Sequence, residues 1–327
     1  MDKIAFIAGE TFLYWNSILI TLSALTATVL FLAFYLGRSG NGFGAFLVIP
    51  MSFLSSMVIS RFIHWYCQTD NYASLLVAMT DYSAGGYALC GVFAGCILSA
   101  CLLRILKIVK DLPQMLDAMA LAGAAGIGLG RLACFYTSAD RGDVLDSVWD
   151  FPVAWPVINP VTGAEENRLA IFFFQALVCG VIFLCMLLFW LTKRDIRKNG
   201  DTCLMFLLVY GVCQVLLDSL RYDSLYFRTN GFISIVQILC AAGILLAVIV
   251  FSVRLVKGIG FYAWQLMIWV LVAGFLGLAG YMEYYIQRHG DLGVLAYSIM
   301  GGSLLFILLF VALFIYPIGT RNATENE

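Results

Sequence analysis

Charged residues are scarce in this sequence. Asp, Glu, Lys and Arg make up 12% of the 327 residues, whereas hydrophobic residues make up 62%. This composition excludes a water-soluble globular domain. With 19 Lys and Arg against 20 Asp and Glu, the net charge is −1. No basic surface is therefore available for nucleic acid, which we exclude as a partner.

Patterns that bind metal ions or form disulfide frameworks are also missing. The chain has two His, and its ten Cys lie mostly within long apolar runs, without Cys-x-x-Cys or Cys/His metal spacing. We interpret the Cys residues as small buried hydrophobic side chains. The sequence predicts no metal ion and no cofactor.

Long apolar runs dominate what remains. A helix that crosses a bilayer needs about 20 consecutive apolar residues, and nine such runs follow one another along the chain. They lie near 14–36, 43–66, 86–106, 113–135, 169–192, 203–220, 232–253, 261–284 and 294–317. No stretch alternates with the two-residue period of a barrel strand. The sequence therefore predicts an all-α, polytopic integral membrane helical bundle of about nine transmembrane helices.

Lys and Arg residues gather in alternate connections between these runs. Because cytoplasmic segments carry the excess of such residues, we expect the N-terminus outside and the C-terminus in the cytoplasm. The longest connection, about 138–168, then lies outside. Pro152, Pro156 and Pro160 break any helix there, so an irregular cap is predicted.

Arg131 is the clearest polar residue within a span. It follows Gly123, Gly126, Gly128 and Gly130, which would let helices approach closely. An Arg at the bilayer centre costs about 2.5–3.5 kcal/mol on insertion scales, so one that persists faces a partner, a cavity or the interface. Two interpretations stay open: an ion pair with Asp140 or Asp81, or a guanidinium directed at a lipid phosphate.

Two further arginines, Arg61 and Arg221, lie near the predicted outer ends of their spans. Gln214 and Asp218 precede Arg221 on one helix face, and Asp218 is close enough to pair with it. A local structural ion pair is one interpretation. The alternative is that Arg61, Arg131 and Arg221 converge on a phospholipid head group.

Small residues begin the third apolar run: Gly85, Gly86, Cys90, Gly91 and Gly95. They are typical of tight helix packing, with Cys90 as an inert buried side chain. The last two spans carry Gly274, Gly277, Gly280, Gly301 and Gly302, for which we also expect close helix contacts.

From about residue 12 to 257, these segments in order resemble the bacterial prolipoprotein diacylglyceryl transferase family. The best anchor is residues 130–135, which resemble the family's Gly-Arg-x-Gly-Asn-Phe segment. Residues 81–95 resemble its Asp/Glu-Gly-Gly-x-x-x-His-Gly-Gly stretch, residues 210–221 its Tyr-Gly-x-x-Arg…Glu…Arg helix, and residues 233–237 its Ile-Ser-x-x-Gln helix. Residues 14–16 are similar to its His-Trp-Tyr, and Arg61 to the Arg of its Gly-Gly-Arg.

The chain also departs from the family pattern. Cys90 stands where the family has the His of His-Gly-Gly, Cys134 replaces the Asn, and Gln214 replaces the first Arg of its helix. Residues 169–175, which end in Gln175, lack the family's His-Pro-x-Gln-Leu-Tyr-Glu. Most of the acid–base groups are thus replaced.

The resemblance implies transfer of the diacylglyceryl group from phosphatidylglycerol to a lipobox cysteine thiol at the outer face of the bacterial plasma membrane. The implied partners are phosphatidylglycerol, a prolipoprotein lipobox peptide and the surrounding membrane lipids, with no cofactor and no metal ion. Arg131 and Arg61 would bind the lipid phosphate, with Arg221, Asp218 and Tyr210 as catalytic residues and Asp81 as a further candidate base. The pocket would be lined by Gly85, Gly86, Cys90, Gly91, Gln214 and Gln237.

Because so many acid–base groups are replaced, a second hypothesis is a catalytically degenerate lipid-binding or partner-binding membrane protein of the same fold. A small-solute transporter is disfavoured, since no internal repeat is visible. We expect a seven-span transferase-like domain over residues 1–257. A two-span helical hairpin with a short polar tail would follow over residues 258–327.

Overall fold

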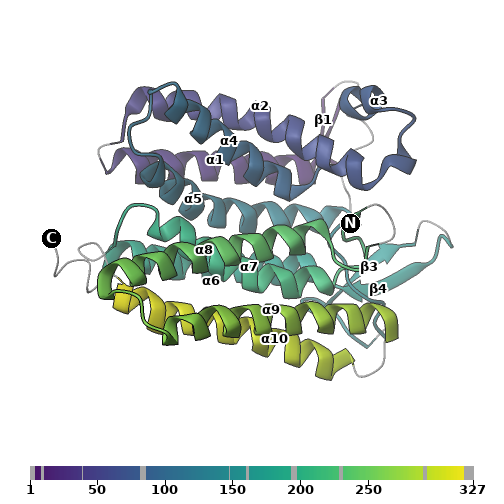
Figure 1. Cartoon of the computed structure of the whole chain (residues 1–327). Coiled ribbons are helices and arrows are strands. Elements are labelled where there is room, and N and C mark those ends of the chain that lie inside the picture. Colours follow the sequence, from purple (N-terminus) through teal and green to yellow (C-terminus); the bar gives the residue numbers. More distant parts are fainter. Residues whose placement is uncertain are drawn as a thin grey trace.

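Long helices lying side by side form the protein in a computed structural model, which describes residues 4–8, 11–38, 40–81, 86–146, 148–159, 162–192, 197–227, 231–289 and 293–319 (Figure 1). Eight helical segments are long and apolar enough to cross a membrane. They are built on α1 (Trp15–Leu36), α2 (Gly42–Cys67), α5 (Leu112–Leu132), α6 (Ile171–Thr192), α7 (Asp201–Ser219), α8 (Ile235–Ile259), α9 (Trp264–His289) and α10 (Gly293–Phe310). The predicted all-α membrane bundle is confirmed.

The ninth predicted span corresponds to a shorter helix, α4 (Leu89–Ile105), of 17 residues. At 1.5 Å per residue it is about 26 Å long, at the lower limit for crossing a bilayer. Short helical segments extend two of the spans: a 3₁₀ turn, η2 (Ala133–Tyr136), follows α5, and a π-helical segment, η4 (Val311–Ile315), follows α10. Each of the nine predicted runs therefore overlaps one observed helix.

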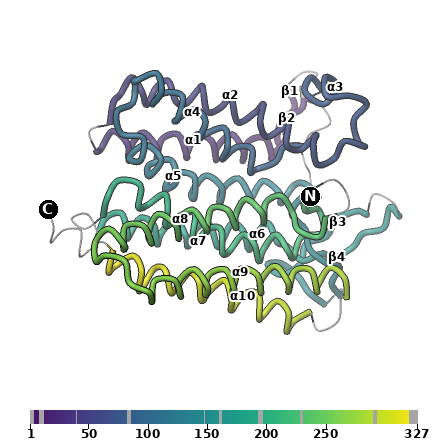
Figure 2. Tube along the Cα trace, in the orientation of Figure 1, coloured from purple at the N-terminus to yellow at the C-terminus, as the bar shows by residue number. Residues whose placement is uncertain are grey.

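Helix α5 runs between two groups of helices (Figure 2). On one side, Met115, Ala118 and Ala122 join an apolar core formed with α1, α2 and α4. On the other side, Leu121 and Ala124 join a larger core that extends through α6, α7 and α8 to α9 and α10. This central position leaves the carboxyl end of α5, where Arg131 lies, surrounded by other elements.

Glycines bring α2 and α4 into backbone contact. A Cβ atom at Gly91 would overlap the backbone of Ser60, and one at Gly95 would overlap Ser56. The Ser60 hydroxyl donates a 2.6 Å hydrogen bond to the Ala88 carbonyl oxygen. The tight packing predicted for Gly91 and Gly95 is confirmed. The same prediction is wrong for four glycines of the last two helices, because an added Cβ there meets nothing within 4 Å: Gly274, Gly277, Gly280 and Gly302.

Adding one methyl group at Gly91 should therefore destabilise the protein. We expect Gly91→Ala to lower the free energy of unfolding by about 1–3 kcal/mol, because the backbones of α2 and α4 must separate. Gly123→Ala is the matched control, since a Cβ there meets nothing within 4 Å, and helix propensity favours Ala by about 1 kcal/mol. Denaturant titration in detergent micelles measures both. Equal stability of the two variants would contradict the close contact.

Two antiparallel hairpins lie at one end of the bundle, which we call the hairpin end (Figure 1). Strand β1 (Ile4–Ala8) pairs with β2 (Thr11–Tyr14), and β3 (Ala154–Ile158) pairs with β4 (Glu165–Leu169). Within the connection 138–168, the pairing of β3 with β4 is the part that its prolines did not predict, whereas the described residues before β3 form the expected irregular segment. Pro156 prevents a helix there, but in a two-stranded ribbon it is tolerated because every strand is an edge strand.

Shorter elements complete the hairpin end. A 3₁₀ turn, η1 (Thr69–Asn71), and the short helix α3 (Leu75–Thr80) follow α2. Gly85 and the polar tail from residue 320 lie outside the described residues.

Candidate functional site

Two arginines converge on one carboxylate at the hairpin end. Arg131 lies in the last turn of α5, and Arg221 follows the end of α7. Arg131 Nη1 forms a short ion pair with Asp140 Oδ2, while Arg221 Nη2 lies 2.9 Å from Asp140 Oδ1. Both arginine side chains are 12% exposed, and Asp140 is 4% exposed. Of the two interpretations of Arg131, the ion pair with Asp140 is the one observed.

Arg221 connects this pair to two further aspartates. Its Nη1 donates to Asp218 Oδ1 at 3.1 Å, and its Nε donates to Asp223 Oδ1 at 3.0 Å. Asp223 Oδ2 in turn accepts a 2.9 Å bond from the Asp140 backbone N–H. We call Arg131, Arg221, Asp140, Asp218 and Asp223 the Asp–Arg cluster. Two positive and three negative side chains give it one net negative charge.

Helix α8 fixes the position of Asp218. The Ser234 hydroxyl caps the N-terminus of α8 and forms a short hydrogen bond with Asp218 Oδ2. Gln237 completes a capping box, because its Oε1 accepts a 2.9 Å bond from the Ser234 backbone N–H. Its Nε2 donates to the Val215 carbonyl oxygen at 3.3 Å. Gln237 therefore joins α7 to α8 beside the cluster.

The segment that carries Asp140 is held in an unusual conformation. Asp140 has φ +56°, in the left-handed region that side chains other than Gly rarely adopt. The neighbouring Arg141 is buried, and its Nη2 donates 2.9 Å bonds to the carbonyl oxygens of Cys134 and Thr137. The Cys134 thiol donates to Asp140 Oδ2 at 3.1 Å. These contacts direct the Asp140 carboxylate inward, toward both arginines.

Several buried polar atoms in this region have no hydrogen-bond partner among the described residues. They are Arg131 Nε, Arg141 Nε and Nη1, both amide atoms of Gln175 and Gln214 Nε2. Gln175 lies one turn after Phe172, whose N–H donates to the Asp140 carbonyl oxygen at 3.0 Å. Gln214 lies one turn before Asp218. Because a buried polar group without a partner is costly, each of these atoms would gain stability from a hydrogen-bond partner.

Arg61 does not join the cluster. Its Nε, Nη1 and Nη2 donate bonds of 2.6, 2.8 and 2.6 Å to the carbonyl oxygens of Ala78, Gly86 and Asp81. Its guanidinium also lies 5.2 Å and 5.4 Å from the ring centroids of Tyr72 and Tyr87. The residue is 2% exposed. Arg61 thus joins α2 to the α3 region, and the predicted convergence of three arginines is observed for only two.

The other predicted site residues lie on α7, on α4 and in the segment just before α4. Tyr210 is buried in α7 and stacks on Phe206 with centroids 5.2 Å apart. Cys90 is buried near the start of α4. Gly91 packs on Ser60, while Gly86 has φ +83° and packs on the His64 ring.

Sequence reasoning named Asp140 only as a possible ion-pair partner, and it missed the roles of Asp223, Arg141 and Ser234. The signals were weak, since Asp140, Arg141 and Asp223 lie in connections where charged residues are common. Among the described residues, no group of three His, Cys, Asp or Glu could hold a metal ion.

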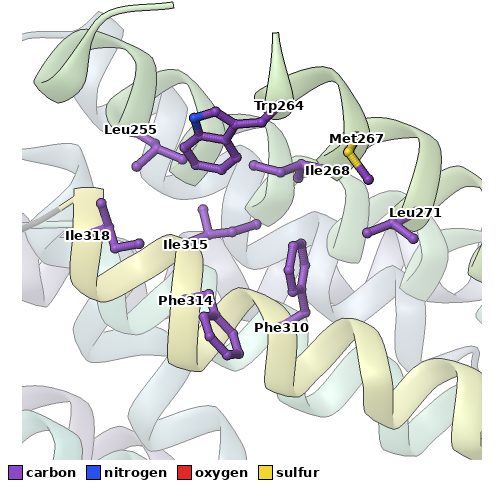
Figure 3. Close-up of a pocket in the computed structure, with 9 residues that line it drawn as sticks. All are labelled: Leu255, Trp264, Met267, Ile268, Leu271, Phe310, Phe314, Ile315 and Ile318. Carbon is purple, nitrogen blue, oxygen red and sulfur yellow. The ribbon is translucent and has the colours of Figure 1, made fainter. Parts of the chain in front are cut away.

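An apolar groove of about 270 Å³ lies elsewhere, between α8, α9 and the segment from the end of α10 through η4 (Figure 3). Trp264 and Ile268 of α9 face Phe310 and Ile315 across it. It is lined by apolar side chains and does not include the Asp–Arg cluster.

The two arginines control the ionisation of Asp140. Burial alone would raise the pKa of this carboxyl group, but the positive charges of Arg131 and Arg221 outweigh burial and lower the pKa to about 2. The group therefore stays ionised at neutral and mildly acidic pH.

Because the pKa of Asp140 is lower in the folded protein than the value of about 3.9 expected when unfolded, its contribution to stability is complete above that pH. We expect the stability difference between the wild type and Asp140→Asn to stay constant from pH 7 to about pH 4. It should then shrink as the pH falls toward 2. Thermal unfolding of both proteins in detergent across this range measures the difference. A decrease between pH 7 and 5 would contradict the lowered pKa.

Comparison with known proteins identifies the family to which the chain belongs. The family model described as prolipoprotein diacylglyceryl transferase matches residues 3–253. The chain belongs to this family. The resemblance found in the motifs is thereby confirmed. The match ends within α8, so α9 and α10 lie beyond it.

Named relatives show how distant the similarity is. A phosphatidylglycerol–prolipoprotein diacylglyceryl transferase of Finegoldia magna is 27% identical over 255 residues, covering 76% of this chain and 95% of the relative. An enzyme of the same name from Clostridium botulinum is 23% identical over 259 residues, with the same coverage. The aligned similarity thus covers almost the whole length of both relatives, although the sequence identity is low.

Proposed function

We propose that this multi-pass membrane protein transfers the diacylglyceryl group of phosphatidylglycerol to the thiol of a lipobox cysteine in a prolipoprotein. Family membership and the names of the two relatives support the reaction. We further propose that the protein lies in the bacterial plasma membrane with its N-terminus outside and its C-terminus in the cytoplasm, so that the hairpin end faces outward. The family core would comprise residues 1–257, with residues 258–327 as an added hairpin and tail.

The observation that carries this proposal is the convergence of Arg131 and Arg221 on one anionic group. A guanidinium binds carboxylate and phosphate with the same fork of donors. We infer that a phosphate oxygen of phosphatidylglycerol takes the place of the Asp140 carboxylate between the two arginines. The unpartnered atoms of Gln175 and Gln214 would then receive the remaining polar atoms of the head group.

In the proposed reaction, the thiol loses its proton and its sulfur attacks the carbon of the diacylglyceryl group that is bonded to the phosphate oxygen. A C–S bond forms as the C–O bond to phosphate breaks, and the electron pair of the C–O bond leaves with glycerol phosphate. Arg131 and Arg221 would stabilise the negative charge that develops on the leaving phosphate.

Of the two predicted candidates, Asp218 can accept the thiol proton as a carboxylate, whereas the phenol of Tyr210 already carries a proton and could only donate it. Asp218 is the better positioned for this role because it contacts Arg221, which would bind the leaving phosphate. Arg61 would need to break three hydrogen bonds to carbonyl oxygens before it could bind phosphate. We therefore propose that the phosphate binds at Arg131 and Arg221. Arg61 instead has a structural role, because it holds α3 and Gly86 against α2.

Incubation of the purified protein with phosphatidylglycerol and a lipobox peptide tests the proposed function. We expect a mass gain of one diacylglyceryl group on the peptide cysteine. Binding of phosphatidylglycerol without transfer would instead support the second hypothesis, a catalytically degenerate lipid-binding protein of the same fold. That hypothesis is based on the replacement of family residues by Cys90, Cys134 and Gln214. Absence of both binding and transfer would exclude both functions.

A further inference from the structure

A buried carboxyl group lies in the part of the chain that the family does not share. Glu283 belongs to α9, beyond the family match that ends at residue 253, and it is 3% exposed. Among the described residues, no Lys, Arg or His forms an ion pair with it. A carboxyl group within a membrane-spanning helix is costly to insert and generally has a functional or structural partner.

The partner of Glu283 is the residue that ends α7. Ser219 donates a short hydrogen bond from its hydroxyl to Glu283 Oε2. Glu283 Oε1 accepts a 3.2 Å bond from Gln287 Nε2, one turn further along α9. Both carboxylate oxygens are thus engaged, one within α9 and one across to α7.

The second helix of the hairpin contacts the same residue. Tyr297 of α10 donates from its hydroxyl to the Ser219 carbonyl oxygen at 3.4 Å. Ser219 directly follows Asp218 and lies two residues before Arg221. Any displacement of Ser219 would therefore move Asp218 of α7 and Arg221 just beyond the end of α7, both members of the Asp–Arg cluster.

We propose that the α9–α10 hairpin positions the Asp–Arg cluster, with Glu283 as the positioning residue that holds the end of α7. The hairpin then determines the geometry of the site, in addition to covering an apolar face of the bundle. This inference rests on the proposed function, because the cluster is taken to bind the phosphate that leaves.

Four variants test the proposal. Glu283→Leu removes the acceptor for Ser219, whereas Glu283→Gln retains an amide oxygen that can accept the same bond. Ser219→Ala removes the donor. Gln265→Leu is the matched control, because Gln265 is equally buried in α9 but lies at the opposite end of that helix. Among the described residues, its side chain bonds only to the backbone of Gly260 and Tyr262.

Hydrogen–deuterium exchange of residues 216–224 reports on position without requiring activity. We expect exchange there to rise about tenfold in Glu283→Leu, to stay close to wild type in Glu283→Gln, and to be unchanged in Gln265→Leu. The transfer rate should fall up to about 10²-fold in Glu283→Leu, since displacement by about 1 Å can have that effect. The Glu283→Leu/Ser219→Ala double variant should be no slower than the slower single variant, because one contact is lost in both.

The outcomes separate the two proposals. If the wild type transfers no lipid but the exchange pattern holds, the proposed function fails and the positioning role stands. If transfer occurs and Glu283→Leu matches Gln265→Leu in both exchange and rate, the positioning role is overturned. Equal loss in Glu283→Leu and Glu283→Gln would also overturn it, because the Ser219 bond would then not be the cause.

Discussion

Arg131→Ala is expected to lower the rate of diacylglyceryl transfer by about 10³-fold. The variant removes a preorganised cation from the position where charge develops on the leaving phosphate, and losses of about 10²–10³-fold follow when even one neutral donor of this kind is removed. Arg131→Lys should recover only part of the rate, because an ammonium group does not form the bidentate fork. The measurement is the initial rate of mass gain on a lipobox peptide, per folded molecule.

Arg254→Ala provides the control for this experiment. Arg254 of α8 forms a comparably short ion pair with the buried Asp201. Asp201 begins α7, whereas Asp218 of the cluster lies near the end of that helix. Its loss should reduce stability while the rate per folded molecule stays near that of the wild type. If Arg254→Ala and Arg131→Ala lose the same fraction of activity, the effect of Arg131 is one of folding, and the proposed phosphate site is wrong.

Asp140→Asn should produce the second large effect: it should lower the stability of the protein without lipid and raise its affinity for phosphatidylglycerol. Without a bound anion, the variant leaves Arg131 and Arg221 with one carboxylate fewer, and breaking a buried pair in this way costs about 3–5 kcal/mol of stability. With phosphatidylglycerol, the variant should recover much of that loss and bind the lipid more tightly than the wild type, because no internal carboxylate competes for the two guanidinium groups.

Thermal unfolding in detergent, with and without phosphatidylglycerol, measures both directions at once. Asp223→Asn is the matched comparison, since Asp223 contacts the same Arg221 but is 25% exposed and does not contact Arg131. It should show a smaller loss and no gain in lipid affinity. A wild type that gains as much from the lipid as Asp140→Asn would contradict the exchange of carboxylate for phosphate.

Periodic and compositional features of the sequence were sufficient to predict the spans. A membrane-crossing helix satisfies its own backbone hydrogen bonds, so its length and apolar composition can be recognised without knowledge of its neighbours. The same local reasoning succeeded for Gly91 and Gly95. It missed the hairpin in the connection 138–168, because β3 and β4 pair across a turn and their hydrogen bonds depend on a partner strand.

The candidate site was predicted only in part. Asp218 and Arg221 lie three residues apart on a helical spacing, so their pairing follows from sequence alone. Asp140 lies in a connection, and its left-handed backbone and contact with both arginines depend on Arg141, Cys134 and Asp223 being in place.

By itself, therefore, the sequence determined that this protein is a helical membrane bundle of the diacylglyceryl transferase family, with Arg61 and Arg221 near the ends of their spans. Only the tertiary structure decided that Arg131 and Arg221 share one carboxylate while Arg61 binds three carbonyl oxygens, and that Glu283 of the added hairpin contacts α7. The physical reason is that a span is stabilised by bonds within one helix, whereas an ion cluster forms where several helices meet, and the direction of a side chain there is set by how those helices pack.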